Sequence, residues 1–276
     1  MAMDFTKMHG LGNDYIILDG IRQRIHLTPA LVRKLCDRHR GIGADGVIMI
    51  MPAQKFKGSR VQRGTRPDFR MRIFNADGSE AEMCGNGIRC LGKFVYEHGL
   101  TRKKELLVAT KSGNKILELF TAGQKVTKVK VAMGKPTEIA NDGINAADEE
   151  FQVTRVNLGN PHCVIFTRDI DKLPIERVGP LIECHSKFSQ RTNVEFVKIL
   201  DKSNIKQRTW ERGVGETMAC GTGAAAAVAA AVSNKFVKPP VTVHLKGGDL
   251  LIDYTISNEI YLTGPAEEIY SGSIPL

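Results

Sequence analysis

The feature of this sequence that most constrains its fold is an internal repeat. The segment 83–87 (Met-Cys-Gly-Asn-Gly) resembles the segment 219–223 (Ala-Cys-Gly-Thr-Gly), which lies 136 residues further along the chain. Earlier in each half, the segment 12–15 (Gly-Asn-Asp-Tyr) is echoed by the segment 159–162 (Gly-Asn-Pro-His). Because the two matches occur in the same order, we predict two similar domains with a boundary near Gly123.

Length and composition leave room for two such domains. The chain has 276 residues, of which 42% are hydrophobic and 25% charged, a balance that excludes wholesale disorder, collagen and coiled coil. The six cysteines are too few for a disulfide scaffold and form no C-x-x-C pair, so we expect no structural zinc or other metal site. The segment 1–10 has no apolar core of a secretion signal, and the run 224–232 is too short to span a membrane. We therefore expect a cytoplasmic protein without a membrane partner.

A net charge of +9 raises the alternative of a nucleic-acid surface. Much of the surplus lies between Lys55 and Arg72, where Asp68 is the single acid. No recognisable nucleic-acid module accompanies this run, and charge runs usually face solvent. We interpret 54–67 as an exposed loop and expect no nucleic-acid partner.

Apolar periodicity predicts many strands and few helices. Helices are expected over 29–39, from about 85 to 99, and from 221 to about 234; the last is apolar on every side and should be buried. Many strands around a few central helices indicate a mixed α+β fold. The expected strands are 15–18, 47–51, 71–74, 129–133, 164–166, 194–199, 241–245 and 260–262.

Each copy of the repeat places a cysteine directly before a glycine-rich helix start. The free N–H groups and positive dipole end at such a start lower a thiol pKa and attract anions. We expect Gly85 and Asn86, and equally Gly221 and Thr222, to offer N–H donors to a carboxylate. Two such elements related by symmetry would present both cysteines to one cleft between the domains.

Two thiols that face one small anionic substrate suit the inversion of a stereocentre. One group removes a proton from one face while the other delivers a proton to the opposite face. Helix N-termini aimed at the substrate carboxylate would stabilise the developing carbanion, and no cofactor is needed. By this argument Cys84 and Cys220 are the catalytic pair. The remaining cysteines are interpreted as packing residues: Cys36, Cys90, Cys163 and Cys184.

Seven motifs, in order over nearly the whole chain, resemble diaminopimelate epimerases. The resemblance implies two pseudo-symmetric domains (1–122 with 266–276, and 123–265), each a mixed, mostly antiparallel sheet wrapped around a central helix, with 266–276 returning as a strand to the first domain. It also implies a cofactor-independent, homodimeric two-base epimerase that interconverts LL- and meso-2,6-diaminopimelate in lysine and peptidoglycan precursor biosynthesis. The motifs occupy 12–15, 74–80, 84–90, 159–162, 191–195, 210–217 and 219–223.

The resemblance also carries roles onto particular residues. It makes Cys84 and Cys220 a thiolate/thiol pair whose roles exchange with direction, and it makes His162 and Glu211 residues that tune the cysteines and line the substrate site. One departure is Gly46, where many relatives have glutamine. The groups expected to hold the distal end of the substrate are Asn13, Asn75, Asn160, Asn193 and Arg212, and those expected to hold the reacting carboxylate are Gly85, Asn86, Gly221 and Thr222.

Two other functions remain open at this point. A proline or hydroxyproline racemase would share the fold and the cysteine pair, but a one-ended amino acid would not need the asparagine set and Arg212. A non-catalytic module with a redox-switched disulfide between Cys84 and Cys220 is the second alternative.

Overall fold

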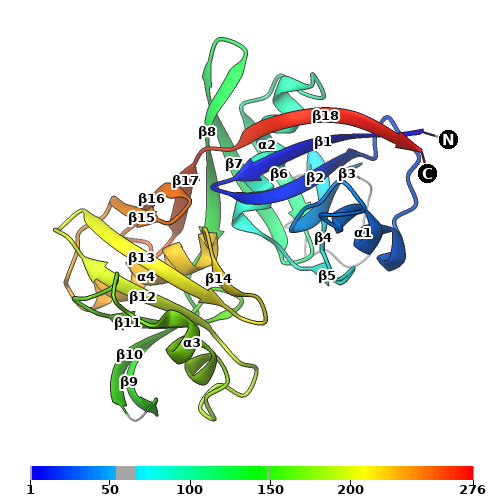
Figure 1. Cartoon of the computed structure of the whole chain (residues 1–276). Helices are drawn as coiled ribbons and strands as arrows, with labels where there is room; N and C mark the ends of the chain where they lie inside the picture. Colours follow the sequence, from blue (N-terminus) through cyan, green and yellow to red (C-terminus); the bar gives the residue numbers. More distant parts are fainter. Residues whose placement is uncertain (1, 54–65, 148, 276) are drawn as a thin grey trace. The chain divides into compact units, whose positions relative to one another are not determined.

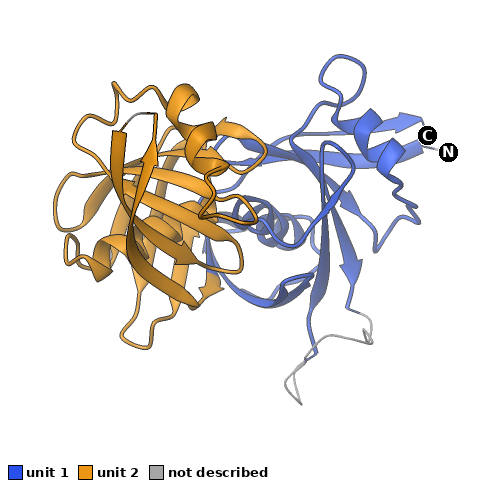
Figure 2. Cartoon of the chain, turned by 90° about the horizontal axis from the view of Figure 1, so that it is seen from below, with its two compact units in different colours: residues 1–131, 264–276 blue, residues 132–263 orange. Residues whose placement is uncertain are grey.

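The computed structural model describes residues 2–53, 66–147 and 149–275. The chain forms two compact units, Met1–Val131 with Gly264–Leu276, and Ala132–Thr263 (Figure 2). Most of the basic loop at 54–67 lies outside the described residues, so its interpretation stays a prediction. In the part of the chain that is described, no helix is both long enough and apolar enough to cross a bilayer.

The strands of the first unit form one sheet, whose described part includes two helical connections, and they are labelled in Figure 1. Its strand order is β18-β1-β2-β3-β4-β6-β7-β8, in which β2/β3 and β4/β6 are parallel and the other neighbours antiparallel. A short strand, β5, pairs with β4. The bounds are β1 Ala2–Gly10, β2 Asn13–Asp19, β3 Gly46–Pro52, β4 Phe69–Asn75, β5 Glu80–Ala81, β6 Glu105–Thr110, β7 Gly113–Ala122, β8 Lys125–Gly134 and β18 Glu267–Pro275.

The second unit repeats this topology strand for strand. Its order is β9-β10-β11-β12-β13-β15-β16-β17, with β11/β12 and β13/β15 parallel, the other neighbours antiparallel, and short β14 beside β13. The structure therefore confirms the duplicated fold predicted from the repeat. The bounds are β9 Glu138–Ala146, β10 Glu149–Asn157, β11 Pro161–Phe166, β12 Asn193–Ile199, β13 Asn204–Glu211, β14 Gly215–Thr217, β15 Val241–Leu245, β16 Gly248–Tyr254 and β17 Ile260–Gly264.

A salt bridge is duplicated along with the strands. In the first unit Arg72 Nε lies 2.7 Å from Glu80 Oε1, and in the second Arg208 Nε lies 2.8 Å from Glu216 Oε1. Each pair joins a long strand to the short strand that leads to the cysteine of the repeat. The two bridges hold equivalent backbone segments in place immediately before each catalytic candidate.

Each unit has one central helix. In the first unit, α2 (Gly85–Glu97) contacts β1, β2, β3, β4, β7 and β18, and in the second, α4 (Gly221–Ser233) contacts β9, β10, β11, β12, β13, β15 and β16. Residues 223–231 of α4 are buried on every side, and seven of them are alanines. Because alanine side chains are small, the surrounding strands can approach the helix axis closely.

Two further helices show where sequence patterns were incomplete. The first, α1, spans Pro29–Cys36 rather than 29–39, and Thr28 caps it by accepting a hydrogen bond from the Leu31 N–H. The second, α3, spans Ile175–Glu183 and was not predicted, because Pro180 inside it normally signals a helix end. The segment 266–276 was expected to return as a strand, and within it β18 (Glu267–Pro275) pairs with β1. Nine of the described strands were not predicted from the sequence: β1, β5, β6, β7, β9, β10, β13, β14 and β16.

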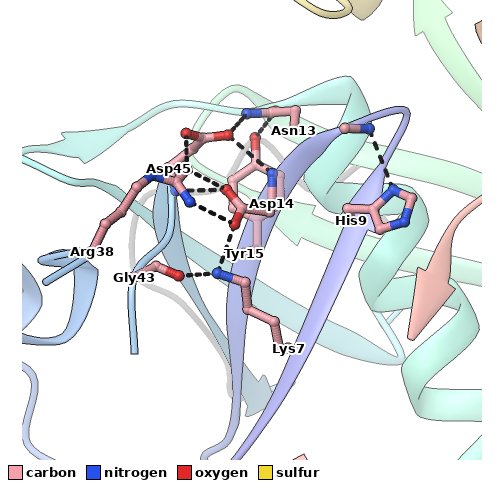
Figure 3. A network of polar contacts seen from close by, with 9 residues as sticks. Lys7, His9, Asn13, Asp14, Tyr15, Arg38, Gly43 and Asp45 are labelled. Carbon is pink, nitrogen blue, oxygen red and sulfur yellow. Dashed lines mark hydrogen bonds and ion pairs between the residues drawn. The ribbon is translucent and has the colours of Figure 1, made fainter. Parts of the chain in front are cut away.

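A network of charges fixes the start of β2 (Figure 3). Asp14 Oδ2 lies 2.6 Å from Lys7 Nζ, and Asp14 Oδ1 lies 2.8 Å from Arg38 Nη2. The same guanidinium lies 2.8 Å from Asp45 Oδ1, and Lys7 also donates to the Gly43 carbonyl. Burial by itself would raise the pKa of Asp14, but hydrogen bonds from Arg38 and Lys7 outweigh it and hold that pKa well below its usual range.

Enlarging one buried alanine tests the close packing of α4. Ala227→Leu adds three carbons at a fully buried position, and we expect it to destabilise the protein by about 2 kcal/mol because neighbouring side chains must shift. Ser233→Leu, at the exposed end of the same helix, is the matched control and should change stability by less than about 0.5 kcal/mol. Equal urea-unfolding midpoints for the two variants would contradict the packing argument.

The Asp14 network predicts a pH-dependent stability difference. The Lys7 side chain is buried, so Asp14→Asn leaves its charge without its partner and should cost about 3 kcal/mol at pH 7. Since folding lowers the pKa of Asp14, its contribution is complete above the unfolded-state pKa of about 3.9 and is lost as the pH falls toward the folded-state value. Urea unfolding from pH 7 to pH 3 should show the gap between wild type and variant narrowing below about pH 4.

The control for this experiment is Asp4→Asn, on an exposed position of β1. It should shift the midpoint little at any pH. A gap for Asp14→Asn that stayed constant from pH 7 to pH 3 would show that the charge of Asp14 contributes nothing to the fold.

Candidate active site

The first cysteine centre consists of Cys84, Asn13, Tyr15 and Asn86, all in the first unit. Cys84 is the N-cap residue of α2, with an extended backbone at φ −135° and ψ 126°. Asn13 and Tyr15 come from the start of β2, and antiparallel pairing with β1 fixes them opposite Gly10 and Met8. Parallel pairing with β3 places Gly46 beside Tyr15.

The polar atoms of this centre converge on the Cys84 sulfur. The Tyr15 hydroxyl lies 2.9 Å from Cys84 Sγ and also donates to Asn13 Oδ1. Asn13 Oδ1 lies 3.8 Å from the same sulfur and accepts a hydrogen bond of 3.3 Å from Asn86 Nδ2. The amide nitrogen sets the orientation of the Asn13 side chain, because Nδ2 donates to Asp45 Oδ2 at 2.8 Å (Figure 3). The charge network described above therefore aims Asn13 Oδ1 at the thiol.

Close packing explains the glycine at position 46. A Cβ built on Gly46 would lie 2.4 Å from the Phe74 carbonyl oxygen, on the neighbouring strand β4. The glutamine expected from the resemblance has no room here unless β4 moves. This chain thus lacks that polar side chain. The polar groups next to this position are the Asp45 carboxylate and the Asn13 amide, which are hydrogen-bonded to each other.

The second cysteine centre consists of Cys220, Thr222, Asn160, His162, Glu195 and Glu211. Cys220 is the N-cap residue of α4, and its sulfur accepts a hydrogen bond of 3.4 Å from the Gly223 N–H. The Thr222 hydroxyl lies 3.5 Å from the same sulfur and accepts from Asn160 Nδ2 at 3.4 Å. Asn160 and His162 flank the start of β11, the counterpart of β2.

A buried histidine–glutamate contact supports this centre. His162 Nδ1 lies 2.8 Å from Glu195 Oε1, and both side chains are 0% exposed. His162 Nε2 lies 3.0 Å from Asn160 Oδ1. The two contacts hold the imidazole ring between Glu195 and Asn160. Gly223 is required beside this pair, because a Cβ there would lie 2.6 Å from Glu195 Oε1.

Burial and acidic neighbours keep Cys220 protonated. Removal from water raises the pKa of Cys220 well above its usual value, and the negative charges of Glu211 and Glu195 raise it further. Hydrogen bonds from Thr222 and Gly223 act in the opposite direction but do not compensate. Burial likewise raises the pKa of Glu211, whose carboxylate accepts a 2.6 Å hydrogen bond from the Thr217 hydroxyl. The second cysteine centre therefore favours a neutral thiol.

The other predicted site residues lie at strand ends or in turns close to these elements. Asn193 Nδ2 donates to the Pro161 carbonyl at 3.0 Å, and Asn193 Oδ1 accepts from the Arg212 N–H at 3.0 Å. The exposed Arg212 guanidinium donates to the Gln190 carbonyl at 3.1 Å. Asn75 bonds to Ser79 within the β4–β5 turn. The structure thus brings Asn13 and Asn86 to Cys84, and Asn160, His162 and Glu211 to the surroundings of Cys220.

Both helix starts place the positive end of a helix dipole beside a cysteine. The first helical hydrogen bonds run from Ile88 N–H to the Cys84 carbonyl and from Ala224 N–H to the Cys220 carbonyl. The Gly223 N–H of α4 also donates to Cys220 Sγ. A dipole end of this sign favours a nearby negative charge. Among the described residues, no group of three His, Cys, Asp or Glu side chains is arranged to hold a metal ion.

The remaining cysteines differ from the expectation in one case. Cys36, Cys90 and Cys163 are buried as predicted, and burial raises the pKa of Cys36 to about 11 and that of Cys90 to about 12. Cys184 is exposed, so its interpretation as a packing residue was wrong. It follows the last residue of α3, the helix that the sequence did not predict, and sequence alone gave no basis for its position.

Tyr15 and Glu195 were given no role in the sequence analysis, although both lie inside its motifs. The internal repeat contains a signal for Tyr15, because it aligns Tyr15 with His162, a predicted site residue. Tyr15 pairs with Gly46 across β2/β3, and His162 pairs with Asn193 across β11/β12, so Tyr15 and His162 occupy equivalent positions. The same equivalence matches Ile48 on β3 with Glu195 on β12.

Comparisons with known proteins agree over the full length of the chain. The family model described as diaminopimelate epimerase matches residues 5–139 and 154–269. A diaminopimelate epimerase of Pelotomaculum thermopropionicum is 46% identical and one of Methanococcus maripaludis 45%; each alignment covers 99% of this chain, and 99% and 100% of the relative. One of Leptospira biflexa is 42% identical, with 100% of both chains covered.

Solved structures show the same fold at low identity. A Bacillus anthracis phenazine biosynthesis protein of the PhzF family has a TM-score of 0.73 at 16% identity, with 100% of each chain covered. A hydroxyproline epimerase of Agrobacterium vitis has a TM-score of 0.69 at 16% identity, covering 99% of this chain and 92% of that one. The duplicated fold, the cysteine at each central helix start and the full-length family match lead to one conclusion: the chain belongs to the diaminopimelate epimerase family.

Proposed function

We propose that this protein interconverts LL- and meso-2,6-diaminopimelate, using Cys84 and Cys220 as the two bases. The observation that carries the proposal is the duplicated N-cap cysteine, set in a chain that matches diaminopimelate epimerases over its whole length. The two isomers differ in configuration at one α-carbon. Inversion there requires one base to remove the proton and a second acid to deliver a proton to the opposite face.

The helix starts supply what this proton transfer needs. Loss of the α-proton places negative charge on the α-carbon and its carboxylate. N–H groups that already point at a bound carboxylate stabilise this charge in the transition state without reorganising. We therefore assign Gly85 and Asn86, with Gly221 and Thr222, to the reacting carboxylate. The chemistry needs no cofactor, because the thiols move the proton and the helix starts stabilise the charge.

The second cysteine centre favours one protonation state. The raised pKa of Cys220 favours its thiol form, and in the direction that uses Cys220 as the acid, Cys84 is the base. Each turnover reverses this arrangement, because the base has become a thiol and the acid a thiolate. His162 and Glu211 act on Cys220 from their positions in the second cysteine centre, as site-lining and tuning residues.

The distal end of diaminopimelate carries an ammonium and a carboxylate. We propose that Asn13, Asn75, Asn160, Asn193, Glu211 and Arg212 contribute to holding this substrate. A guanidinium is the preferred partner of a carboxylate, and the exposed Arg212 side chain is free to turn toward one, since one backbone carbonyl is a replaceable partner. Asparagine amides offer both donors and acceptors for the two distal groups.

We also propose a homodimer that acts in the cytoplasm. Ile269 and Tyr270 on β18 expose 52% and 46% of their surface, which offers an apolar contact for a second copy. A reducing compartment suits the chemistry, because both thiols must stay free, as all six cysteines are in this structure. Analytical ultracentrifugation tests the oligomer, and Tyr270→Glu should shift it toward the monomer.

Removing either thiol should abolish inversion. Cys84→Ala and Cys220→Ala should each lower kcat by about 10³-fold or more, because each deletes one of the two proton-transfer groups. Chiral chromatography of LL- and meso-diaminopimelate measures the rate, and deuterated water should label the inverted carbon without added pyridoxal phosphate or metal. Cys184→Ala, at the exposed cysteine, is the matched control and should keep wild-type activity. Full activity in Cys84→Ala would refute the two-base assignment.

Substrate comparison separates this function from a racemase of proline or hydroxyproline. A site whose polar groups bind a distal amino-acid end should discriminate by roughly 10⁴-fold in kcat/KM against a substrate that lacks it. We expect turnover of LL-diaminopimelate and none measurable for L-proline or trans-4-hydroxy-L-proline under the same reducing conditions. Comparable rates for L-proline would show that no group of this protein selects its substrate by the distal amino-acid end.

A further inference from the structure

We propose that the Tyr15 hydroxyl is a positioning group for Cys84 that changes its hydrogen bond with the protonation state of the sulfur. The proposal deepens the assignment of Cys84 as a base and rests on it. Tyr15 lies 69 residues from Cys84 in the sequence, yet its hydroxyl oxygen is 2.9 Å from Cys84 Sγ.

The hydroxyl is held in place from both ends. The Tyr15 side chain belongs to the core and is 5% exposed, so packing around the ring fixes where the hydroxyl lies. On its other side the hydroxyl meets Asn13 Oδ1, an acceptor whose orientation is set by the bond from Asn13 Nδ2 to Asp45. The phenol therefore sits between a fixed amide acceptor and a sulfur that can be either thiol or thiolate.

Rotation of the Tyr15 hydroxyl about its C–O bond allows a hydrogen bond to both protonation states of Cys84. When Cys84 is a thiol, S–H donates to the Tyr15 oxygen and the Tyr15 O–H donates to Asn13 Oδ1. When Cys84 has given its proton to the substrate α-carbon, the Tyr15 O–H turns and donates to the thiolate. Tyr15 keeps its own proton throughout, so the proton balance of the epimerisation is unchanged. Hydrogen bonds to an ionised acceptor are stronger than neutral ones, so the turn stabilises the thiolate.

A two-base enzyme needs such a partner because each cysteine must be stable in both states. A fixed acceptor alone would favour the thiol, and a fixed cation alone would favour the thiolate. The second cysteine centre places His162 at the position equivalent to Tyr15, and there the hydroxyl beside the sulfur is that of Thr222, at 3.5 Å. Each thiol thus has a rotatable hydroxyl neighbour, supplied by a different element.

Tyr15→Phe removes only the hydroxyl oxygen and is the decisive variant. We expect kcat to fall about tenfold, the change expected for a loss of about 1.4 kcal/mol, while KM for LL-diaminopimelate changes little, since Tyr15 acts through Cys84. The matched control is Tyr96→Phe, on α2 in the same unit, which should keep the wild-type kcat. A kcat equal to that of wild type in Tyr15→Phe would overturn the proposal.

Alkylation of Cys84 without substrate gives a readout that a packing role would not move. Iodoacetamide labelling across pH, followed by peptide mass spectrometry, should show the midpoint for Cys84 about one pH unit higher in Tyr15→Phe, because the thiolate has lost a donor. The exposed Cys184 provides the reference labelling rate in the same sample. The buried Cys90 should stay unlabelled as long as the first unit is folded. The nearby groups Arg89, Cys90, Asp14 and Asp45 are unchanged in every variant.

Site-specific 3-fluorotyrosine at position 15 keeps the hydroxyl and makes it a stronger donor. The Cys84 midpoint should then move below that of wild type, opposite to the shift in Tyr15→Phe. If both variants left the Cys84 midpoint unchanged, the proposal would be refuted whatever the activity of Cys84→Ala. If Cys84→Ala stayed active while both midpoints moved as expected, the hydrogen bond would stand and the catalytic assignment of Cys84 would fail.

Discussion

The chemistry that we propose for this protein depends on a helix N-terminus that lies inside a wrapped sheet. Each central helix starts directly after a cysteine, so the first N–H groups, the dipole and the sulfur all lie at one end of one buried element. The strands around the helix exclude water from most of its length, and glycines at Gly87 and Gly223 allow a neighbouring strand to approach its first turn. Proton abstraction from a weakly acidic carbon needs such prearranged donors.

Charges remote from the sulfur determine how the first cysteine centre is aligned. Arg38 holds Asp14 and Asp45 together, Asp45 holds the Asn13 amide, and Asn13 faces both Tyr15 and Cys84. A chain of hydrogen bonds thereby connects a partly exposed ion-pair network to the Cys84 sulfur. The arrangement suits catalysis. Because the Asn13 amide cannot turn, only the Tyr15 hydroxyl proton and the Cys84 thiol proton can change their hydrogen-bond partners.

The duplicated units have kept one architecture and diverged in polar detail. Strand order, direction and the Arg–Glu bridge before each cysteine are the same in both. Beside the helix starts, however, Tyr15 and Ile48 of the first unit correspond to His162 and Glu195 of the second. In the second unit, burial and the negative charges of Glu211 and Glu195 raise the pKa of Cys220.

The sequence by itself determined the duplication, the two helix starts and the candidate cysteines, because each depends on residues adjacent in the chain. Local patterns did not reveal α3, because proline normally ends a helix and Pro180 lies inside this one. They also did not reveal that Cys184, directly after α3, is exposed. Only tertiary structure decided that Tyr15 meets Cys84 and that Glu195 is buried against His162. Those contacts join residues 69 and 33 positions apart: the first packs the start of α2 against β2, and the second crosses the parallel pair β11/β12.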